Sequence, residues 1–515
     1  FNDLNGNGRY DVGEPGEPFF DMNDNGYWDA PNFLQDDWEP YIDLNDNGQW
    51  DGVDGFNERG FDRWAVWSDR ETEIWMLKGD LTSQVNQENQ IKTGFEAQFI
   101  RIEMNQIQYP EAYYDGTPDG MPWSSRGVFR SFYERSPKQL AFYVQDKMEY
   151  GGLIANVGLR ADVFLQASEV LDSAVEQSIL DVIGPEIGYE VVPSRTKISP
   201  RLGMSYPVTD KSKLFFSYGH FYQLPGYDNM YQTPTQGGNA LRLIGNPSLD
   251  FQKTVSYEIG VAYAISEKMT LQFSGYYRDV YDLLNTTTMQ LGPLSQSVYG
   301  NVDYGRSRGI ELSFDKSYSN YWSLTSNYQF SFAYGKSSSD RSGYDAILDQ
   351  TAIPLRDLPL NWDQRHSVMV NIDLRAQKDD HPVLFGYQMP DDWGASLQFT
   401  WGTGFPYTPS DNNPNWDVKP GEKAWERTNA LRMPNQYNVD FRLTKNFELA
   451  KLDWQVFLDI DNVTNRRNID NVYADTGLPD DANVLDGLGN GMLYYSDPTH
   501  WTSPRNIKVG VKMSF

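Results

Sequence analysis

Residues 1–62 carry a motif of acidic and amide side chains that occurs three times. The copies begin at Asp3, Asp21 and Asp43, and each reads Asp-x-Asn-x-Asn-Gly-x-x-Asp. The segment holds 16 acidic and two basic residues, a net charge of −14 that is half of the chain's −28. Calcium prefers six to eight hard oxygen ligands, and a short loop supplies them from positions 1, 3, 5, 7, 9 and 12, with Gly at position 6. The motif therefore predicts calcium-binding loops.

The expected ligands follow from those loop positions. In the first copy they are Asp3, Asn5, Asn7, the Arg9 carbonyl, Asp11 and Glu14. In the second they are Asp21, Asn23, Asn25, the Tyr27 carbonyl and Asp29, and in the third Asp43, Asn45, Asn47, the Gln49 carbonyl, Asp51 and Asp54. Asn32 stands at position twelve of the second copy, so either this site is weaker or a nearby acid, Glu17 or Asp37, substitutes. We predict up to three structural Ca²⁺ sites.

The alternative is a run of Asn-Gly turns with solvated acids. This interpretation is the poorer one, because all three copies carry suitable oxygen ligands at the required positions. Pro15, Pro18, Pro31 and Pro40 exclude paired flanking helices. The segment therefore resembles the tandem calcium loops of thrombospondin type 3 and dockerin-like repeats. This resemblance implies a structural, extracellular site with an affinity of about 10⁻⁴–10⁻³ M. Without metal, the clustered acids repel, and we expect the segment to be disordered.

The composition of the 515 residues excludes several other classes of protein. There is no Cys, the four His have no metal-ligand spacing, and no phosphate-binding or nucleophile motif occurs, so we expect no enzyme. The acidic balance offers no footprint for nucleic acid. No run of 18 apolar residues occurs, so no transmembrane helix is expected. Aromatic residues make up 15% of the chain, which is high.

From about residue 70 onward, apolar and polar residues alternate with a period of two. In residues 452–460 the apolar positions are Leu452, Trp454, Val456, Leu458 and Ile460, and the last strand alternates in the same way up to Phe515. A soluble sandwich or propeller alternates too. Three features favour lipid instead: full charges such as Arg160 on the polar face, strands of about 10–15 residues, and alternating short and long connections. The sequence predicts an all-β fold, a transmembrane antiparallel β-barrel.

We expect fifteen strands in this chain, at 71–86, 90–104, 136–149, 153–167, 197–207, 213–223, 253–265, 269–283, 304–316, 321–335, 363–376, 392–402, 437–447, 452–464 and 505–515. Short turns are expected near Glu88, Gly151, Asp210, Glu267, Asn320 and Ala450, with a medium connection near 379–391 and long loops elsewhere. Because short turns are periplasmic and long loops extracellular in such barrels, the C-terminus is placed in the periplasm and the calcium segment outside. Bacterial barrels close with even strand numbers, so an odd count indicates either that strands are missing from this chain or that the count of fifteen is off by one.

Several short motifs are similar to those of TonB-dependent outer-membrane receptors, especially the Bacteroidota type. They are Phe142-Tyr143-Val144-Gln145-Asp146-Lys147, Ser199-Pro200-Arg201-Leu202-Gly203, Gly245-Asn246-Pro247-Ser248-Leu249, Ser256-Tyr257-Glu258-Ile259-Gly260, Tyr304-Gly305-Arg306-Ser307-Arg308-Gly309-Ile310-Glu311 and Asp461-Asn462-Val463-Thr464-Asn465. Phe515 resembles the terminal aromatic residue that the barrel-assembly machinery reads. The resemblance implies a barrel of about 22 strands with a plug domain. We expect the plug, the first strands and the energy-coupling segment to lie outside this chain.

The resulting hypothesis has an acidic extracellular segment, residues 1–62, and an outer-membrane barrel portion, residues 63–515. The resemblance implies TonB-dependent uptake of an unidentified nutrient, contact with outer-membrane lipid, coupling to TonB through a region not in this chain, and a surface lipoprotein as a further partner. The alternatives are a non-transporting surface, adhesion or structural barrel, and a diffusion porin.

Some side chains allow two interpretations. His220 and His366 are either lumen ligands or ordinary polar residues, and the acid pairs 379–380 and 391–392 are solvated turns rather than catalytic carboxylates. Loop aromatics either stack on a sugar or peptide or pack the loops; they are Tyr113, Tyr114, Trp123, Tyr227, Tyr231, Trp362, Trp416 and Trp425.

Overall fold

The computed structural model describes residues 66–108, 130–166, 192–232, 243–291, 294–348, 354, 356–384, 386–481 and 498–514. The chain divides into two compact units, of which the larger comprises Thr72–Glu103, Tyr133–Thr233 and Asn239–Phe515. The other unit, Phe1–Glu71, Met104–Phe132 and Pro234–Gly238, lies mostly outside the described residues. The side chains that form the site described below all belong to the larger unit.

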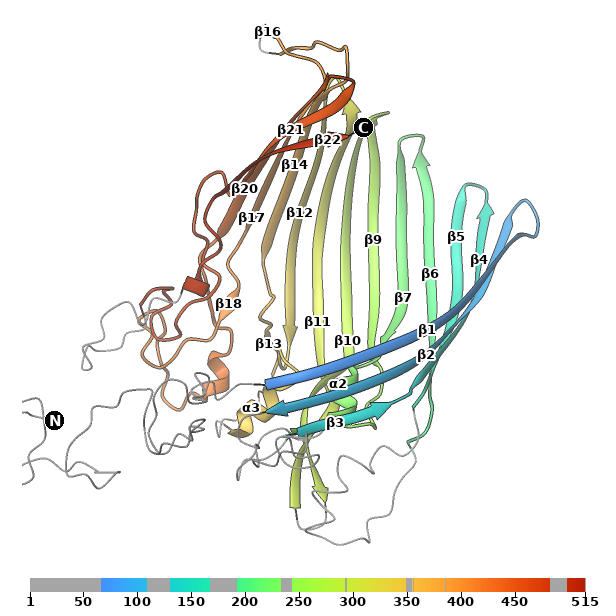
Figure 1. Cartoon of the computed structure of the whole chain (residues 1–515). Coiled ribbons are helices and arrows are strands. Elements are labelled where there is room, and N and C mark those ends of the chain that lie inside the picture. The colour runs from blue at the N-terminus through green and yellow to red at the C-terminus, as the bar shows by residue number, and fades with distance from the viewer. Residues whose placement is uncertain are drawn as a thin grey trace, which may run out of the picture. The chain divides into compact units, whose positions relative to one another are not determined.

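A single antiparallel sheet dominates the larger unit, and its long strands lie side by side in chain order (Figure 1). The long strands are β1 (Val66–Gln84), β2 (Asn89–Gln108), β4 (Lys138–Tyr150), β5 (Leu153–Leu165), β6 (Arg195–Thr209), β7 (Ser212–Gln223), β9 (Gln252–Ser266), β10 (Met269–Leu291), β11 (Leu294–Ser319), β12 (Trp322–Gly335), β14 (His366–Ala376), β17 (Trp393–Gly402), β20 (Gln436–Leu449), β21 (Leu452–Asp461) and β22 (Asn506–Ser514). These confirm the fifteen predicted strands.

Tight turns join the strands at the upper end of the sheet in Figure 1. Three of them contain two consecutive residues with positive φ: Gly151–Gly152, Asn320–Tyr321 and Ala450–Lys451. This geometry is that of the type I′ turn, whose twist matches the twist of the flanking strands. The positions agree with the predicted short turns. The medium connection between β14 and β17 contains a small hairpin of β15 (Val383–Leu384) and β16 (Tyr387–Gln388).

The long connections lie at the opposite end and hold the remaining elements. These are β3 (Arg130–Arg135), α2 (Tyr227–Tyr231), β8 (Leu243–Ile244), α3 (Ser342–Leu348), β13 (Leu358–Pro359), β18 (Pro406–Tyr407), η2 (Ala424–Arg427), β19 (Leu431–Arg432) and η3 (Pro498–His500). The expectation of a long loop between the predicted strands 269–283 and 304–316 was wrong, because β10 and β11 stay paired as far as Leu291 and Leu294. None of the helices in the described segments has the length and apolarity of a transmembrane span.

The two faces of the sheet differ in chemistry. Residues opposite each other on neighbouring strands share a face, so the register assigns each side chain. One row across six strands reads Phe273, Leu312, Tyr328, Val368, Trp401 and Tyr437, and the adjacent parallel row across five reads Gln272, Ser313, Asn327, Met369 and Thr400. We call the first face outer and the second inner. Large apolar side chains stay exposed on the outer face, including Val509 at 72% and Val511 at 60%.

The well-packed core lies among the long connections rather than between sheet layers. Phe164 and Met230 are fully buried, and Leu249 and Tyr344 nearly so. Tyr133 packs against Tyr231 of α2 with ring centroids 5.8 Å apart. The folded connections therefore form a fixed rim at the loop end of the strands.

Candidate functional site

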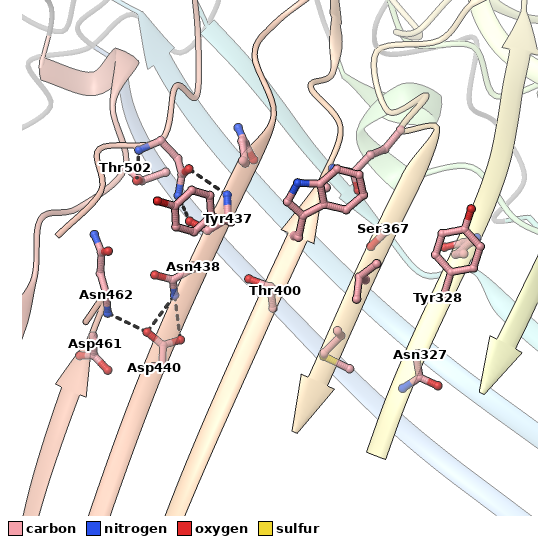
Figure 2. A pocket seen from close by; sticks show the side chains of 18 of the residues that line it. Asn327, Tyr328, Ser367, Thr400, Tyr437, Asn438, Asp440, Asp461, Asn462 and Thr502 are labelled. Atoms are coloured by element: carbon pink, nitrogen blue, oxygen red, sulfur yellow. Dashed lines mark hydrogen bonds between the residues drawn. The ribbon is translucent and has the colours of Figure 1, made fainter. Parts of the chain in front are cut away.

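The inner face of β11 to β22 lines a first hollow of about 1000 Å³. Apart from Met369, its inner-face side chains are amides, hydroxyls and three carboxylates, Glu311, Asp440 and Asp461, and among the described residues no Lys or Arg lines it. Figure 2 shows Asn438, Asp440 and Asn462 gathered at one side, with Thr400 on the neighbouring β17 and Asn327 farther along the sheet on β12. The lining can accept and donate hydrogen bonds over a wide area, which suits a polar solute.

The Asp461-Asn462-Val463-Thr464-Asn465 motif folds back over the end of β20. Asn438 Nδ2 donates to both oxygens of Asp440 at 2.8 Å, and the Asn462 backbone N–H donates to Asp440 Oδ1 at 2.8 Å. Asn462 and Asn465 both adopt positive φ, which Asn tolerates better than most residues. The motif is therefore a strand-end cap that fixes the rim of the first hollow.

Asn468 continues the ladder of β20 with its side chain. Its Oδ1 accepts the Tyr437 N–H at 3.0 Å and its Nδ2 donates to the Tyr437 carbonyl at 2.8 Å. A side-chain amide thus replaces a strand neighbour, and the connection after β21 is held against the first hollow.

A second hollow of about 890 Å³ lies on the inner face of β1 to β10. Five cations line it, Lys78, Lys92, Arg160, Arg201 and Arg278, and Glu258 is its single carboxylate. Arg160 forms an ion pair with Asp162 at 2.8 Å. Two of the other cations lie over aromatic rings: Arg201 is 4.9 Å from the Phe221 centroid and Arg278 is 4.8 Å from that of Tyr276. The lining of the second hollow is therefore basic, whereas that of the first is amide-rich and acidic.

The two histidines are not inner-face ligands. His366 and His220 both lie on the outer face by register, opposite Phe330 and Val255. His366 Nδ1 is 2.9 Å from the Tyr328 hydroxyl, and His220 Nε2 is 2.7 Å from the Tyr218 hydroxyl. Each is thus a polar strand residue satisfied by a tyrosine. Within the described segments, no group of three or more His, Cys, Asp or Glu side chains is placed to hold a metal.

The acid pairs hold the connection between β14 and β17. Asp391 accepts the Asp379 backbone N–H at 2.9 Å and Lys445 Nζ at 3.1 Å. The Asp379 N–H and the Lys445 ammonium together lower the pKa of Asp391. Asp380 accepts the Tyr321 hydroxyl at 3.0 Å. As the sequence predicted, these are turn carboxylates.

The loop aromatics that the structure describes mostly pack. Tyr227 and Tyr231 stack with an interplanar angle of 6°, and Tyr231 is only 2% exposed. Burial raises the pKa of the Tyr231 hydroxyl, which therefore stays neutral. Trp416 donates to Glu422 at 3.1 Å, and only Trp362, at 54%, is widely exposed. Tyr113, Tyr114, Trp123, Phe515 and the calcium ligands predicted between Asp3 and Asp54 lie outside the described residues.

Sequence reasoning missed a buried ionic network beside the first hollow. Asp363 is 1% exposed, accepts the Ala333 backbone N–H at 2.8 Å, and pairs with both Arg365, at 3.0 Å, and Arg432. These residues come from β12, the segment before β14, and β19. A lone Asp between Trp and Gln gives no periodic signal, so only the fold brings its partners together.

The sequence model of the family described as TonB dependent receptor-like, beta-barrel, matches residues 1–463. The chain belongs to this family. Family membership places it in the outer membrane, and the antiparallel sheet with its outer and inner faces agrees with a receptor barrel. No curated protein matches the chain.

Solved structures show the same fold at low sequence identity. The outer membrane transporter YddB from Escherichia coli has a TM-score of 0.55 and 12% identity over 87% of this chain and 55% of that chain. The copper transporter OprC has a TM-score of 0.53 and 14% sequence identity, over 87% of this chain and 58% of that chain. FpvA from P. aeruginosa, bound to heterologous pyoverdines, has a TM-score of 0.52 and 12% sequence identity, over 87% of this chain and 48% of that chain. This receptor chain thus spans about half the length of those transporters.

Proposed function

We propose that this chain is the barrel portion of a Bacteroidota-type outer-membrane receptor that imports a nutrient by TonB-dependent transport. The observation that carries the proposal is the polar inner face, which lines two hollows of about 1000 and 890 Å³ behind an apolar outer face. Such a sheet offers a polar path through a lipid layer. In this proposal the long connections face outward and the C-terminus faces the periplasm.

The edges of the sheet support a larger assembly. Among the described residues, β22 pairs with β21 alone, and β1 pairs with β2 alone among the fifteen long strands. An unpaired backbone group in hydrocarbon costs several kcal/mol, so both edges need partners. We propose that further strands complete a barrel of about 22, that a plug fills it, and that TonB engages the plug side. A surface lipoprotein over the long connections and barrel-assembly machinery at Phe515 complete the proposed partners.

Nutrient uptake by cells that express the complete receptor tests the transport proposal. A strain lacking the gene is compared with its complemented parent on single labelled nutrients, with and without a protonophore. The proposal expects one nutrient whose uptake requires both the gene and the proton gradient. Uptake that requires the gene but survives the protonophore indicates a diffusion porin. No uptake difference on any nutrient, together with lost surface attachment, indicates an adhesion or structural barrel.

We also propose that the three loops between Asp3 and Asp54 bind calcium. The support is the ligand spacing of the three copies and a net charge of −14 over residues 1–62. Removing calcium should expose the segment to proteases, because unneutralised acids repel one another. Limited proteolysis with chelator, and with calcium restored, measures this effect. Cleavage of residues 1–62 at the same rate in both conditions contradicts the proposal, and Asp3→Ala with Asp21→Ala and Asp43→Ala should reproduce the chelated pattern.

A further inference from the structure

Arginines follow the apolar belt of β11 on the outer face. Alternate residues of this strand share that face, and from the loop end they read Arg306, Arg308, Ile310 and Leu312. All four are exposed. The strand therefore presents two guanidinium groups directly beyond the part that suits acyl chains.

Aromatic rings hold these cations in place. Arg308 lies opposite Tyr277 on β10 and Phe332 on β12, and its guanidinium carbon is 5.6 Å from the Phe332 centroid. Arg365, from the segment before β14, lies over the same ring at 4.2 Å and donates to the Tyr334 hydroxyl at 2.9 Å. Two guanidinium groups thus converge on one phenyl ring.

The charges around this ring do not balance. Arg306 pairs with Asp279 at 3.0 Å. Arg365 pairs with Asp363, but that carboxylate also serves Arg432. For Arg308 the described residues provide no ion pair. Four arginines thus face two carboxylates, an excess of two positive charges in a chain whose net charge is −28. Next to Arg306 on the loop side, Lys336 lies over the Tyr304 ring, and the Tyr304 hydroxyl donates to Asp357. The positive charge of Lys336 is therefore balanced by the negative charge of Asp357.

We propose that Arg306, Arg308 and Arg365, the outer arginine cluster, bind the phosphate of an anionic lipid headgroup in the surrounding membrane. Guanidinium groups recognise phosphate oxygens through paired N–H donors. The neighbouring Ile310 and Leu312 supply an apolar surface for the acyl chains of the same molecule. A soluble anion would use only the arginines, whereas a lipid uses the whole row.

Lipid binding by the complete receptor in detergent tests this proposal. Native mass spectrometry and thermal unfolding are followed with phosphatidylglycerol, with phosphatidylcholine, and with inorganic phosphate. The expected result is preferential binding of phosphatidylglycerol with a raised Tm. Arg308→Gln should weaken that binding about tenfold, because a charge-assisted hydrogen-bond pair is lost. Arg308→Lys keeps the charge without the fork and should fall in between.

Arg201→Gln is the matched control, since Arg201 is also an exposed arginine over an aromatic ring but on the inner face. It should leave phosphatidylglycerol binding unchanged. Equal binding of the two lipids, unchanged binding in Arg308→Gln, or the same loss in Arg201→Gln overturns the proposal. So does inorganic phosphate binding as tightly as the lipid, which would indicate a free-anion site. If Arg308→Gln does not fold, Arg308→Lys decides.

Discussion

The outer and inner faces of one strand experience different solvents. On β11, Ile310 and Leu312 stand among Phe330 and Phe273, whereas Glu311 and Ser313 stand among Gln329 and Asn327. The backbone hydrogen bonds are common to both, so only the side chains distinguish the faces. The comparison shows that residues one position apart have unrelated constraints: the outer residue must suit lipid, and the inner residue must suit the polar interior.

The largest loss of stability is expected from substitution of the buried Asp363, which lies at the loop end of the two faces. Asp363→Ala leaves Arg365 and Arg432 without their shared carboxylate and should cost about 3–5 kcal/mol of stability. Urea unfolding of the receptor in lipid vesicles measures the loss. Asp363→Asn keeps an acceptor for the Ala333 N–H and should cost less. A loss below about 1 kcal/mol for Asp363→Ala would show that the arginines find other partners.

The comparison itself is tested by one cation placed on either side of β14. Val370 lies on the outer face opposite Ser326 and Phe399, and Asn371 lies on the inner face opposite Thr325 and Gln398. Val370→Lys should cost about 2–4 kcal/mol, the value for a cation near the bilayer midplane. Asn371→Lys should stay within about 0.5 kcal/mol. Heat-modifiable gel migration and vesicle unfolding measure both; equal effects would invalidate the face assignment.

A smaller effect is expected in the turns, which belong to neither face. Ala450 has a φ of 58°, in the left-handed region that is unfavourable for a residue with a Cβ atom. Ala450→Asn should therefore raise stability by about 0.5–1 kcal/mol. Gly152→Ala should lower stability by a similar amount, because Gly152 has φ 87° although the nearest side chain, Pro207, leaves space for a methyl group. Tm values of the two variants should move in opposite directions, and a common direction would contradict the turn assignment.

The smallest effect concerns pH at the connection between β14 and β17. The pKa of Asp391 is lowered by the Asp379 N–H and Lys445. Its stabilising contribution is therefore complete above the unfolded pKa of about 3.9 and disappears as pH falls through the lower folded value. The protection factors for hydrogen exchange of residues 379–384 and 386–392 should fall below about pH 4. Asp391→Asn should remove that dependence; an identical pH profile in the variant would assign it to another carboxylate.

Much of the sheet is predictable from the sequence, because the alternation of apolar and polar residues within each strand indicates which residues lie on which face. The alternation of Leu452 to Ile460 locates β21 without any knowledge of its neighbours. The extension of β10 through Asn285, Thr286 and Thr288 could not be found, since a run of polar residues has no period-two contrast. There the pairing with β11 and the contacts with α3, not the local pattern, determine the structure. In the same way, the Gly343 N–H donates to Asn285 Oδ1 at 2.7 Å across 58 residues.

The site residues also differ in whether a local sequence pattern could identify them. Inner-face residues such as Arg160 were identifiable as lumen side chains from alternation alone. The separation of cations around the second hollow from carboxylates around the first depends on which strands share each hollow. The position of His366 on the outer face also follows from the strand's starting point, which no turn signal fixes. Long-range partners, such as Arg432 for Asp363, carry no local signature.

Since every long strand has its sequence neighbour beside it, nearly all pairing in the sheet connects residues that are close along the chain. Every second connection is a tight turn, so the entropic cost of closing each of these hairpins is low. The architecture can therefore grow or shrink by whole hairpins during evolution. A duplicated or deleted pair of strands changes the circumference and leaves every other register intact.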